Sequence, residues 1–127
     1  MTRVLVCGGR DFDDRAALYS ALDGLHAQHR FTVLIAGGAR GADTLAAQWA
    51  RDRGVRTRIF MPRWKNQGPA AGPIRNARML KDGRPELVVA FPGGRGTAGM
   101  MALARTAGVP LALPRLKQPR ARAGPRD

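Results

Sequence analysis

The sequence predicts an α/β protein: a Rossmann-like three-layer α/β/α sandwich around a mostly parallel, five-stranded sheet. Three observations predict this fold class. Short apolar runs of strand length alternate with segments whose apolar residues recur at helical spacing. Three of those runs end in a pair of glycines that turns the chain toward a helix. The chain has 127 residues, 44% of them hydrophobic, which suits one domain that buries a core without disulfides.

Five apolar runs are the predicted strands, and each has the length of a buried strand. The intervening segments carry helical periodicity, so the series alternates strand and helix and predicts parallel strands with helices on both faces. The predicted strands lie at residues 3–7, 32–36, 56–60, 86–91 and 109–113.

Apolar stripes mark the predicted helix faces. In the first helical segment Leu18, Leu22 and Leu25 recur at positions i, i+4 and i+7. We expect each stripe to lie on the sheet. The stripes of the second and the last segment are Leu45, Ala46, Trp49 and Ala50, and Met100, Leu103, Ala104 and Ala107.

The stretch at residues 61–73 interrupts this rhythm, with three prolines and two glycines. We predict a long loop there, and long loops in compact domains are often binding loops. Trp64 lies in it, where the ring could stack on a nucleobase or anchor the loop over the core. The loop leads into a helix whose first turns carry Arg75 and Asn76, which brings further donors to the same end of the sheet.

Paired glycines with a nearby arginine follow three predicted strands, within residues 5–12, 34–43 and 89–99. The carboxyl ends of parallel strands line one crevice, so three such loops would converge on one ligand. Glycine lets the backbone approach a phosphate, a helix start offers free N–H groups, and arginine is a two-pronged donor. The simpler explanation is that the glycines only make tight turns. Three loops with arginine favour a small anionic ligand of nucleotide type.

The predicted phosphate-binding residues come from these loops and from the helix after the long loop. They are Gly8, Gly9, Arg10, Gly37, Gly38, Arg40, Gly41, Arg75, Asn76, Gly93, Gly94, Arg95, Gly96 and Thr97.

Two carboxylates, Asp11 and Asp43, sit just past the first two glycine pairs. A carboxylate there can cap a helix, orient an arginine, accept from a ribose hydroxyl or act as a general base. We expect Asp43 to cap its helix, and both residues are candidates for catalysis.

Two common nucleotide enzymes are excluded by the motifs. Residues 94–99 match the dinucleotide fingerprint in form, but they follow the fourth predicted strand, and no acidic residue lies between them and Asp127 to hold a ribose. The glycine loops also lack the Gly-Lys-Ser/Thr ending of a P-loop. We therefore predict neither an NAD-dependent dehydrogenase nor a nucleoside triphosphatase, and no bound cofactor or metal. Cys7 is predicted to be a core residue.

The net charge is +13, of which +9 falls on residues 1–114. We predict a folded domain over residues 1–114 and a disordered basic tail over 115–127, because the tail is rich in proline and arginine. A basic surface attracts nucleic acid, although a general bias toward arginine would give the same composition. The single cysteine and the absence of a secretory signal or an apolar run of membrane length predict a cytoplasmic protein without membrane contact.

With these motifs in hand, the chain resembles the SLOG superfamily, specifically its small single-domain branch related to YspA and YpsA. The resemblance spans about residues 3–113 and rests on four ordered motifs. It implies a Rossmann-like fold, a site for nucleotides or nucleotide-derived molecules, and a homodimer. The motifs are GGRDF, GGARGADTLA, WKNQGPAAGPIRNARM and PGGRGTAGM.

The superfamily includes phosphoribohydrolases, whose motif P-G-G-x-G-T-x-x-E is reproduced at residues 92–100 with Met100 in place of the glutamate. A thioether cannot move protons as a carboxylate does. The pair Arg75-Asn76 is closer to the DNA-processing branch, DNA-processing protein A, which binds without cleaving. The resemblance therefore favours binding over hydrolysis.

Three functions remain open at the level of sequence. The preferred one is a nucleotide-ligand-binding domain that acts as a sensor, carrier or sequestering protein, without catalysis. The second is a nucleoside 5'-monophosphate N-glycosidase in which Asp11 or Asp43 replaces the missing glutamate. The third is an accessory protein that binds single-stranded nucleic acid through the basic tail and body.

Overall fold

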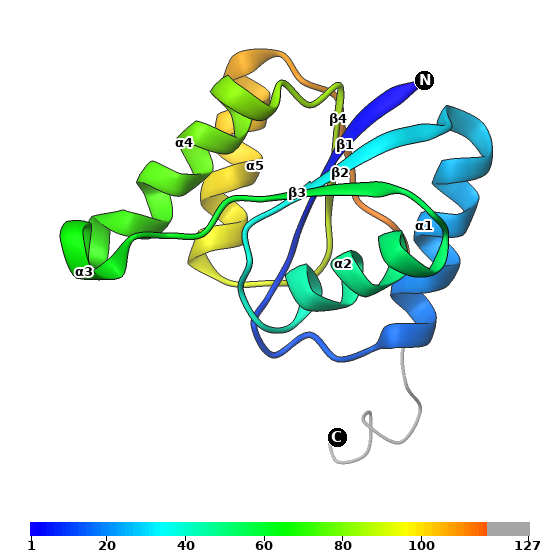
Figure 1. The fold of residues 1–127 in the computed structure, drawn as a ribbon, viewed down its shortest axis with the longest axis horizontal. Coiled ribbons are helices and arrows are strands. Elements are labelled where there is room, and N and C mark those ends of the chain that lie inside the picture. Colours follow the sequence, from blue (N-terminus) through cyan, green and yellow to red (C-terminus); the bar gives the residue numbers. More distant parts are fainter. Residues whose placement is uncertain (117–127) are drawn as a thin grey trace.

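The computed structural model describes residues 1–116 and contains one sheet of five parallel strands. The strand order is β3-β2-β1-β4-β5, so β1 is central and β3 and β5 are the edges (Figure 1). The predicted α/β fold class is thus confirmed. The strands are β1 (Thr2–Cys7), β2 (Phe31–Ala36), β3 (Arg56–Ile59), β4 (Leu87–Ala90) and β5 (Leu111–Ala112).

The central strand is apolar throughout because it is covered on both faces. Val4, Leu5 and Val6 are fully buried, which explains why the sequence shows a continuous apolar run rather than an alternating one. Val4 pairs with Leu34 of β2 on one side and with Leu87 of β4 on the other. The strands that follow β1 in the chain are therefore added first on one side of it, as β2 and β3, and then on the other side, as β4 and β5.

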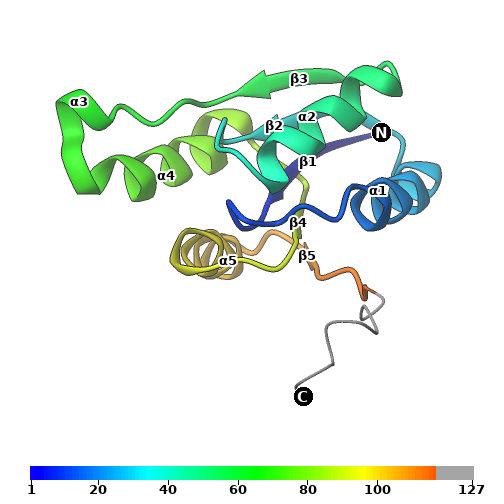
Figure 2. The same cartoon turned by 90° about the horizontal axis from the view of Figure 1, so that it is seen from below.

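Two helices, α1 (Arg15–His29) and α2 (Ala42–Asp52), cover one face of the sheet (Figure 2). Their predicted apolar stripes form the core there: Leu18, Leu22 and Trp49 are fully buried. The start of α1 is capped by Asp14, whose side chain accepts a 3.1 Å hydrogen bond from the amide of Ala17.

The other face is covered by α4 (Ala71–Gly83) and α5 (Arg95–Ala107), which lie on the opposite side of the sheet from α1 and α2 (Figure 2). Met79, Met100 and Ala104 pack there against Leu5 and other strand residues. The predicted stripe of the last helix ends at Ala104, because Ala107 is exposed near the end of α5. Gly108 ends that helix in the left-handed conformation.

The prediction of a long loop over residues 61–73 is wrong in part. One turn of helix, α3 (Trp64–Gln67), and a 3₁₀ turn, η1 (Gly68–Ala70), fill most of it, and α4 already begins at Ala71. The prolines obscured these turns in the sequence, but Pro73 stands in the first turn of α4, where its missing N–H costs no hydrogen bond.

Residues 113–116 run past β5 without regular structure, and Leu116 packs beside the core on the α1 side. Most of the predicted disordered tail, residues 117–127, lies outside the described residues. Within the described part of the chain, no helix is both long and apolar enough to cross a membrane.

Candidate functional site

The loops that follow β1, β2 and β4 contact one another through their backbones. The amide of Gly9 donates a 2.8 Å hydrogen bond to the carbonyl oxygen of Pro92, and the amide of Ala42 donates one of 3.1 Å to the carbonyl oxygen of Gly9. The loop after β1 is therefore joined to both neighbours. The sequence-based expectation that the three loops meet at one edge of the sheet agrees with these contacts.

Close packing of these loops accounts for several of the glycines. A Cβ on Gly41 would lie 2.2 Å from the carbonyl oxygen of Gly9, and one on Gly93 would lie 2.6 Å from the amide nitrogen of Gly9. Gly41 also has a φ of +80°, a conformation that favours glycine. The glycine pairs thus have a structural role in addition to any ligand contact.

Three other glycines of the first two loops lie against side chains. A Cβ on Gly8 would collide with Ala42, one on Gly37 with the guanidinium of Arg75, and one on Gly38 with the sulfur of Met61. At Gly8 the neighbour is the Cβ of Ala42, which moves only with its backbone, whereas the ends of Arg75 and Met61 at the other two positions are flexible.

Arg75 and Asn76 connect α4 to the loops. Nη1 of Arg75 donates to the carbonyl oxygen of Gly37, and Nε donates a 2.9 Å hydrogen bond to Oδ1 of Asn76. Nδ2 of the buried Asn76 in turn donates a 3.2 Å hydrogen bond to the carbonyl oxygen of Gly96 in α5. Both side chains are engaged within the protein, so their first role is to hold the loops after β2 and β4 in place.

Asp43 does not cap α2 as predicted. The N-cap is Gly41, which makes no side-chain hydrogen bond, and Asp43 is the second residue of the helix, within its first turn. Its Oδ2 reaches back to accept a 3.1 Å hydrogen bond from the amide of Ala39. Burial raises the pKa of Asp43, while the hydrogen bond from Ala39 and the charge of Arg75 oppose that rise. The carboxylate therefore fixes the shape of the loop after β2.

Asp11, the other candidate carboxylate, is almost fully exposed. It forms an ion pair of 3.2 Å with Arg40, which joins the loops after β1 and β2. Exposed pairs contribute little stability, so either partner can exchange the contact for one with a ligand.

The first turn of α5 carries no cap. Its N-cap is Gly94, no side chain accepts a hydrogen bond there, and no acidic residue lies in the first turn. A Cβ on Gly94 or on Gly96 would meet nothing within 4 Å, so the space in front of this turn is open. Arg95 is exposed and Thr97 is buried. An uncapped helix start with open space and a basic neighbour suits an anion.

Two sulfur-containing side chains near this edge belong to the core. Met100 is fully buried among the residues between the sheet and the helices α4 and α5. Cys7 is buried at the end of β1, and burial raises the pKa of its thiol to about 12, with the nearby charge of Asp43 adding to the rise. The thiol stays neutral near pH 7 and is not an activated nucleophile, as the sequence predicts for a core cysteine.

Trp64, the candidate for base stacking, is 46% exposed at the start of α3. The guanidinium carbon of Arg10 lies 5.8 Å from the centre of its ring, within the range of a cation–π contact. This approach of the loop after β1 to α3 could not be read from the sequence, because it depends on the path of residues 61–70. The alternative role of Trp64, an anchor buried over the core, does not fit its exposure.

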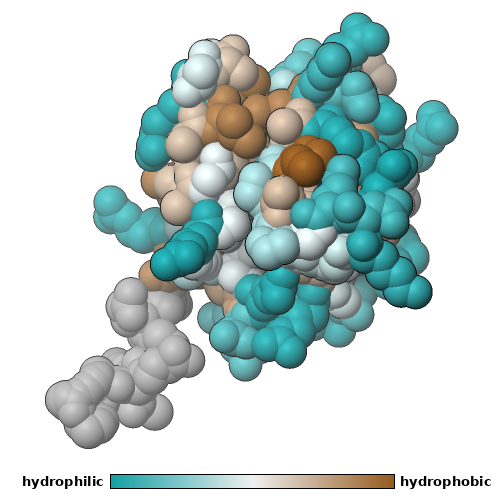
Figure 3. Space-filling view, turned by 90° about the vertical axis from the view of Figure 1, so that its left-hand side faces the viewer, coloured by the Kyte–Doolittle hydropathy of each residue, from teal (hydrophilic) through white to brown (hydrophobic). Residues whose placement is uncertain are grey.

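Three apolar side chains besides Trp64 are also exposed, on β3, just after β3 and on α4. Ile59, Met61 and Ile74 are each at least 38% exposed, and Ile59 and Met61 flank Gly38. Sequence reasoning missed them, because strand and loop residues of this kind are usually buried. Figure 3 views the molecule from the side of α3 and shows small apolar patches within a largely hydrophilic surface.

Comparisons with known proteins agree with this architecture. The model of the YspA, cpYpsA-related SLOG family matches residues 2–67, about half of the chain, which includes the loops after β1 and β2. The Gene 61 protein of Mycobacterium phage D29 is 40% identical over 119 residues, which cover 87% of this chain and 94% of the phage protein. This chain therefore belongs to the YspA, cpYpsA-related SLOG family.

Proposed function

We propose that this protein binds a nucleotide or a nucleotide-derived ligand whose phosphate lies in front of the first turn of α5. The observation that carries the proposal is the uncapped start of that helix at Gly94, with open space before it. Membership of the SLOG family supports a nucleotide-related ligand. Backbone N–H groups at a helix start are suited to a phosphate.

Exposed arginines on the three loops supply the charge for such a ligand. Arg10 follows the glycines after β1, Arg40 lies in the loop after β2, and Arg95 opens α5; all three side chains are exposed. A guanidinium binds phosphate oxygens with two parallel hydrogen bonds. The weak pair of Arg40 with Asp11 leaves that guanidinium available.

The base of the ligand is proposed to stack on Trp64. Its ring is half-exposed and already holds the guanidinium of Arg10 at 5.8 Å, so one planar group is accepted there. A nucleobase can take that place while Arg10 turns to the phosphate, since stacking on an aromatic ring does not depend on base identity.

Binding without hydrolysis fits the side chains near the site. Met100 is buried in the core, and Asp43 is buried and held by the amide of Ala39. Asp11 is the exposed carboxylate of the pair considered for catalysis, and its partner is Arg40. A general base needs access to the proton that it removes, which Asp43 lacks in this arrangement.

The test is a thermal-shift screen of the full chain against nucleoside mono-, di- and triphosphates, cyclic nucleotides, NAD and ADP-ribose, with chromatography of each mixture. A ligand at about 100 times its Kd stabilises the folded state by about 2.7 kcal/mol. A stabilising compound recovered intact supports the proposal. A compound recovered as free base and ribose phosphate would establish the N-glycosidase instead.

Variants at Gly94 then locate the phosphate. In Gly94→Asp, the new carboxylate should accept hydrogen bonds from the first turn of α5 and stabilise the unliganded protein by about a few tenths of a kcal/mol, yet abolish the shift by the ligand. Gly94→Ala is the matched control, because it adds a side chain without an acceptor and should retain the shift. Full retention of the shift in Gly94→Asp would contradict a phosphate at this turn.

Trp64→Ala separates the base from the phosphate. We expect the variant to lose affinity for nucleoside monophosphates by about 1–3 kcal/mol, while ribose 5-phosphate binds as it does to the unchanged protein. Equal losses for both compounds would show that Trp64 shapes the site without contacting a base.

A further inference from the structure

Charge is divided unequally along the chain. Residues 1–52 contain six arginines and six aspartates, and residues 53–116 contain twelve basic residues against only Asp82 and Glu86. The side chains of the first segment are therefore balanced, and the excess of basic over acidic side chains in the described residues falls on the second.

This division coincides with the two faces of the sheet. The balanced segment supplies β1, α1, β2 and α2, and the basic segment supplies β3, α3, α4 and α5. Since α1 and α2 cover one face and α4 and α5 the other (Figure 2), one side of the molecule is strongly basic. The edge strand β3 lies in the sheet between the two helix layers, and all four of its residues are exposed.

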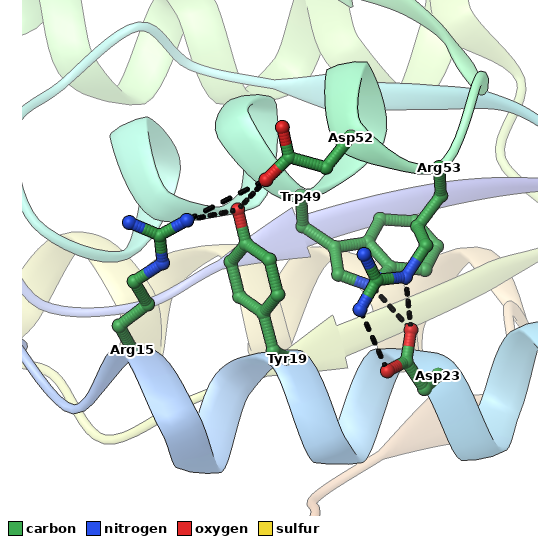
Figure 4. A network of polar contacts seen from close by, with 6 residues as sticks. All are labelled: Arg15, Tyr19, Asp23, Trp49, Asp52 and Arg53. Atoms are coloured by element: carbon green, nitrogen blue, oxygen red, sulfur yellow. Dashed lines mark hydrogen bonds and ion pairs between the residues drawn. The ribbon is translucent and has the colours of Figure 1, made fainter.

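Two arginines on this side, one in α1 and one just after α2, have carboxylate partners. Arg15 lies 3.5 Å from Asp52, and Arg53, just after α2, lies 2.8 Å from Asp23 (Figure 4). Tyr19 lies between these pairs and donates a 2.6 Å hydrogen bond to Asp52. Two positive charges on this side are thus paired within the protein, and the six aspartates of residues 1–52 balance its six arginines in number.

A different situation holds on β3, α3 and α4. Among residues 1–116, no carboxylate lies within 4.0 Å of six basic side chains that we call the basic strip. Glu86, one of the two acidic residues of the segment, is paired with Arg3 at 3.5 Å. The basic strip consists of Arg56, Arg58, Arg63, Lys65, Arg78 and Lys81.

Two members of the basic strip are held against a single ring. The guanidinium carbons of Arg58 and Arg78 lie 4.7 and 5.3 Å from the centre of the Phe60 ring, and Arg58 also donates a 2.9 Å hydrogen bond to the carbonyl oxygen of Asp82. The two guanidinium charges repel each other, and a bound anion would offset that repulsion. Within residues 1–116, no carboxylate offsets the charge of these two side chains as Asp52 and Asp23 offset that of Arg15 and Arg53.

We propose that the basic strip binds the phosphodiester backbone of single-stranded nucleic acid. A chain of phosphates matches a row of unpaired cations, and such contacts need no base recognition. The strip passes from an edge strand to helices that face different ways, and a flexible single strand can follow it where a stiff duplex cannot. This surface is distinct from the glycine loops, and the proposal does not rest on the proposed nucleotide site.

The test measures binding of the full chain to a short fluorescent oligothymidylate by anisotropy over a series of salt concentrations, with a duplex of the same length in parallel. For single strands, the slope of log K against log salt is about −0.7 for each phosphate contact. The double variant Arg56→Gln/Arg63→Gln should make the slope shallower by about 1.4 and weaken binding at least roughly tenfold at about 0.1 M salt. Neither side chain makes a hydrogen bond or ion pair within residues 1–116, so folding should be unaffected.

The matched control is Arg30→Gln/Arg51→Gln, which removes the same charge from two exposed arginines of the balanced segment. We expect this control to bind as the unchanged protein does, and Lys65→Gln/Lys81→Gln to repeat the loss from the basic strip. Equal losses in the control and the strip variants would reduce the effect to net charge. That result, tighter binding of the duplex, or no binding of oligothymidylate at low salt would each overturn the proposal.

Discussion

The side-chain amide of Asn76 donates a 3.2 Å hydrogen bond to the carbonyl oxygen of Gly96 and thereby ties α4 to the first turn of α5. The same side chain accepts a 2.9 Å hydrogen bond from Nε of Arg75, which itself binds the loop after β2. A buried amide thus sets the position of the helix start at which we propose that a phosphate binds.

Replacement of the buried Asn76 by leucine should lower the free energy of unfolding by about 1–3 kcal/mol, because the carbonyl oxygen of Gly96 and Nε of Arg75 lose this hydrogen-bond partner. Urea denaturation provides the measurement. Asn66→Leu, on the exposed surface of α3, is the control and should change stability by less than about 0.5 kcal/mol. Similar values for both variants would show that the link between α4 and α5 contributes nothing.

Gly41→Ala tests the contact between the loops after β1 and β2. A Cβ at Gly41 would lie 2.2 Å from the carbonyl oxygen of Gly9, whereas one at Gly54 would meet nothing within 4 Å, and the two glycines have similar φ values of +80° and +72°. Gly54→Ala therefore carries only the backbone strain of about 1–2 kcal/mol. We expect Gly41→Ala to lose clearly more stability in thermal denaturation. Equal losses would mean that the loops separate without cost.

The buried thiol of Cys7 should make the folded protein less stable at high pH. Burial raises the pKa of its thiol from 9.0 to about 12 in the folded protein, so the folded state keeps the proton that the unfolded chain releases. Its contribution is complete below about pH 9 and declines by about 1.4 kcal/mol for each pH unit up to about pH 12. The difference between the stability curves of the unchanged protein and Cys7→Ala isolates this effect. A difference that does not vary with pH above 9 would show that the thiol is accessible to water.

The carboxylate of Asp23 should make the stability of the folded protein depend on pH at low pH. Its carboxylate accepts hydrogen bonds from Nε1 of the buried Trp49 at 2.8 Å and from Arg53 at 2.8 and 3.0 Å, and the hydrogen bond with Arg53 is the main reason that its pKa is lowered. Its charge therefore stabilises the folded state above its ordinary pKa of 3.8, and this part is lost as the pH falls below that value.

The Asp23→Asn variant keeps an acceptor for Trp49, so it should lose only the pH-dependent part. Asp23→Ala leaves the buried indole N–H without a partner and should cost about 1–3 kcal/mol at neutral pH. Chemical denaturation at neutral and acidic pH distinguishes the two variants. If alanine and asparagine destabilise the protein alike, water satisfies the indole and the hydrogen bond is dispensable.

Much of the fold could be predicted from the sequence because periodicity is a local property. The apolar stripe of Leu18 and Leu22 and the buried run of β1 appear in the structure where the pattern predicts them. The helical turns at residues 64–70 were missed, since a single turn is too short to show a period, and Gly68 and Pro69 are residues typical of loops. The meeting of the glycine loops followed from the general topology of parallel sheets.

The hydrogen-bond partners of individual site residues could not be predicted from the sequence. Arg75 was predicted to contact a phosphate, and its guanidinium binds the carbonyl oxygen of Gly37, a residue far away in the chain. Asp43 was expected to cap its helix, and it accepts from Ala39 instead. Such contacts depend on how close two segments come in space, which no local pattern records. The ligand roles of these residues stay predictions.

The central position of β1 also sets an order of assembly. Val4 of β1 pairs with Leu34 of β2, which is close in sequence, and with Leu87 of β4, which is far away in sequence. Pairing of β1 with β4 therefore closes a much longer loop than pairing with β2. Contacts between distant residues slow the crossing of the folding barrier. We therefore expect β1, β2 and the helix between them to gain structure first, and the docking of β4 to limit the rate of folding. Amide hydrogens of β5, which pairs only with β4, would then be the last of the sheet to become protected from exchange.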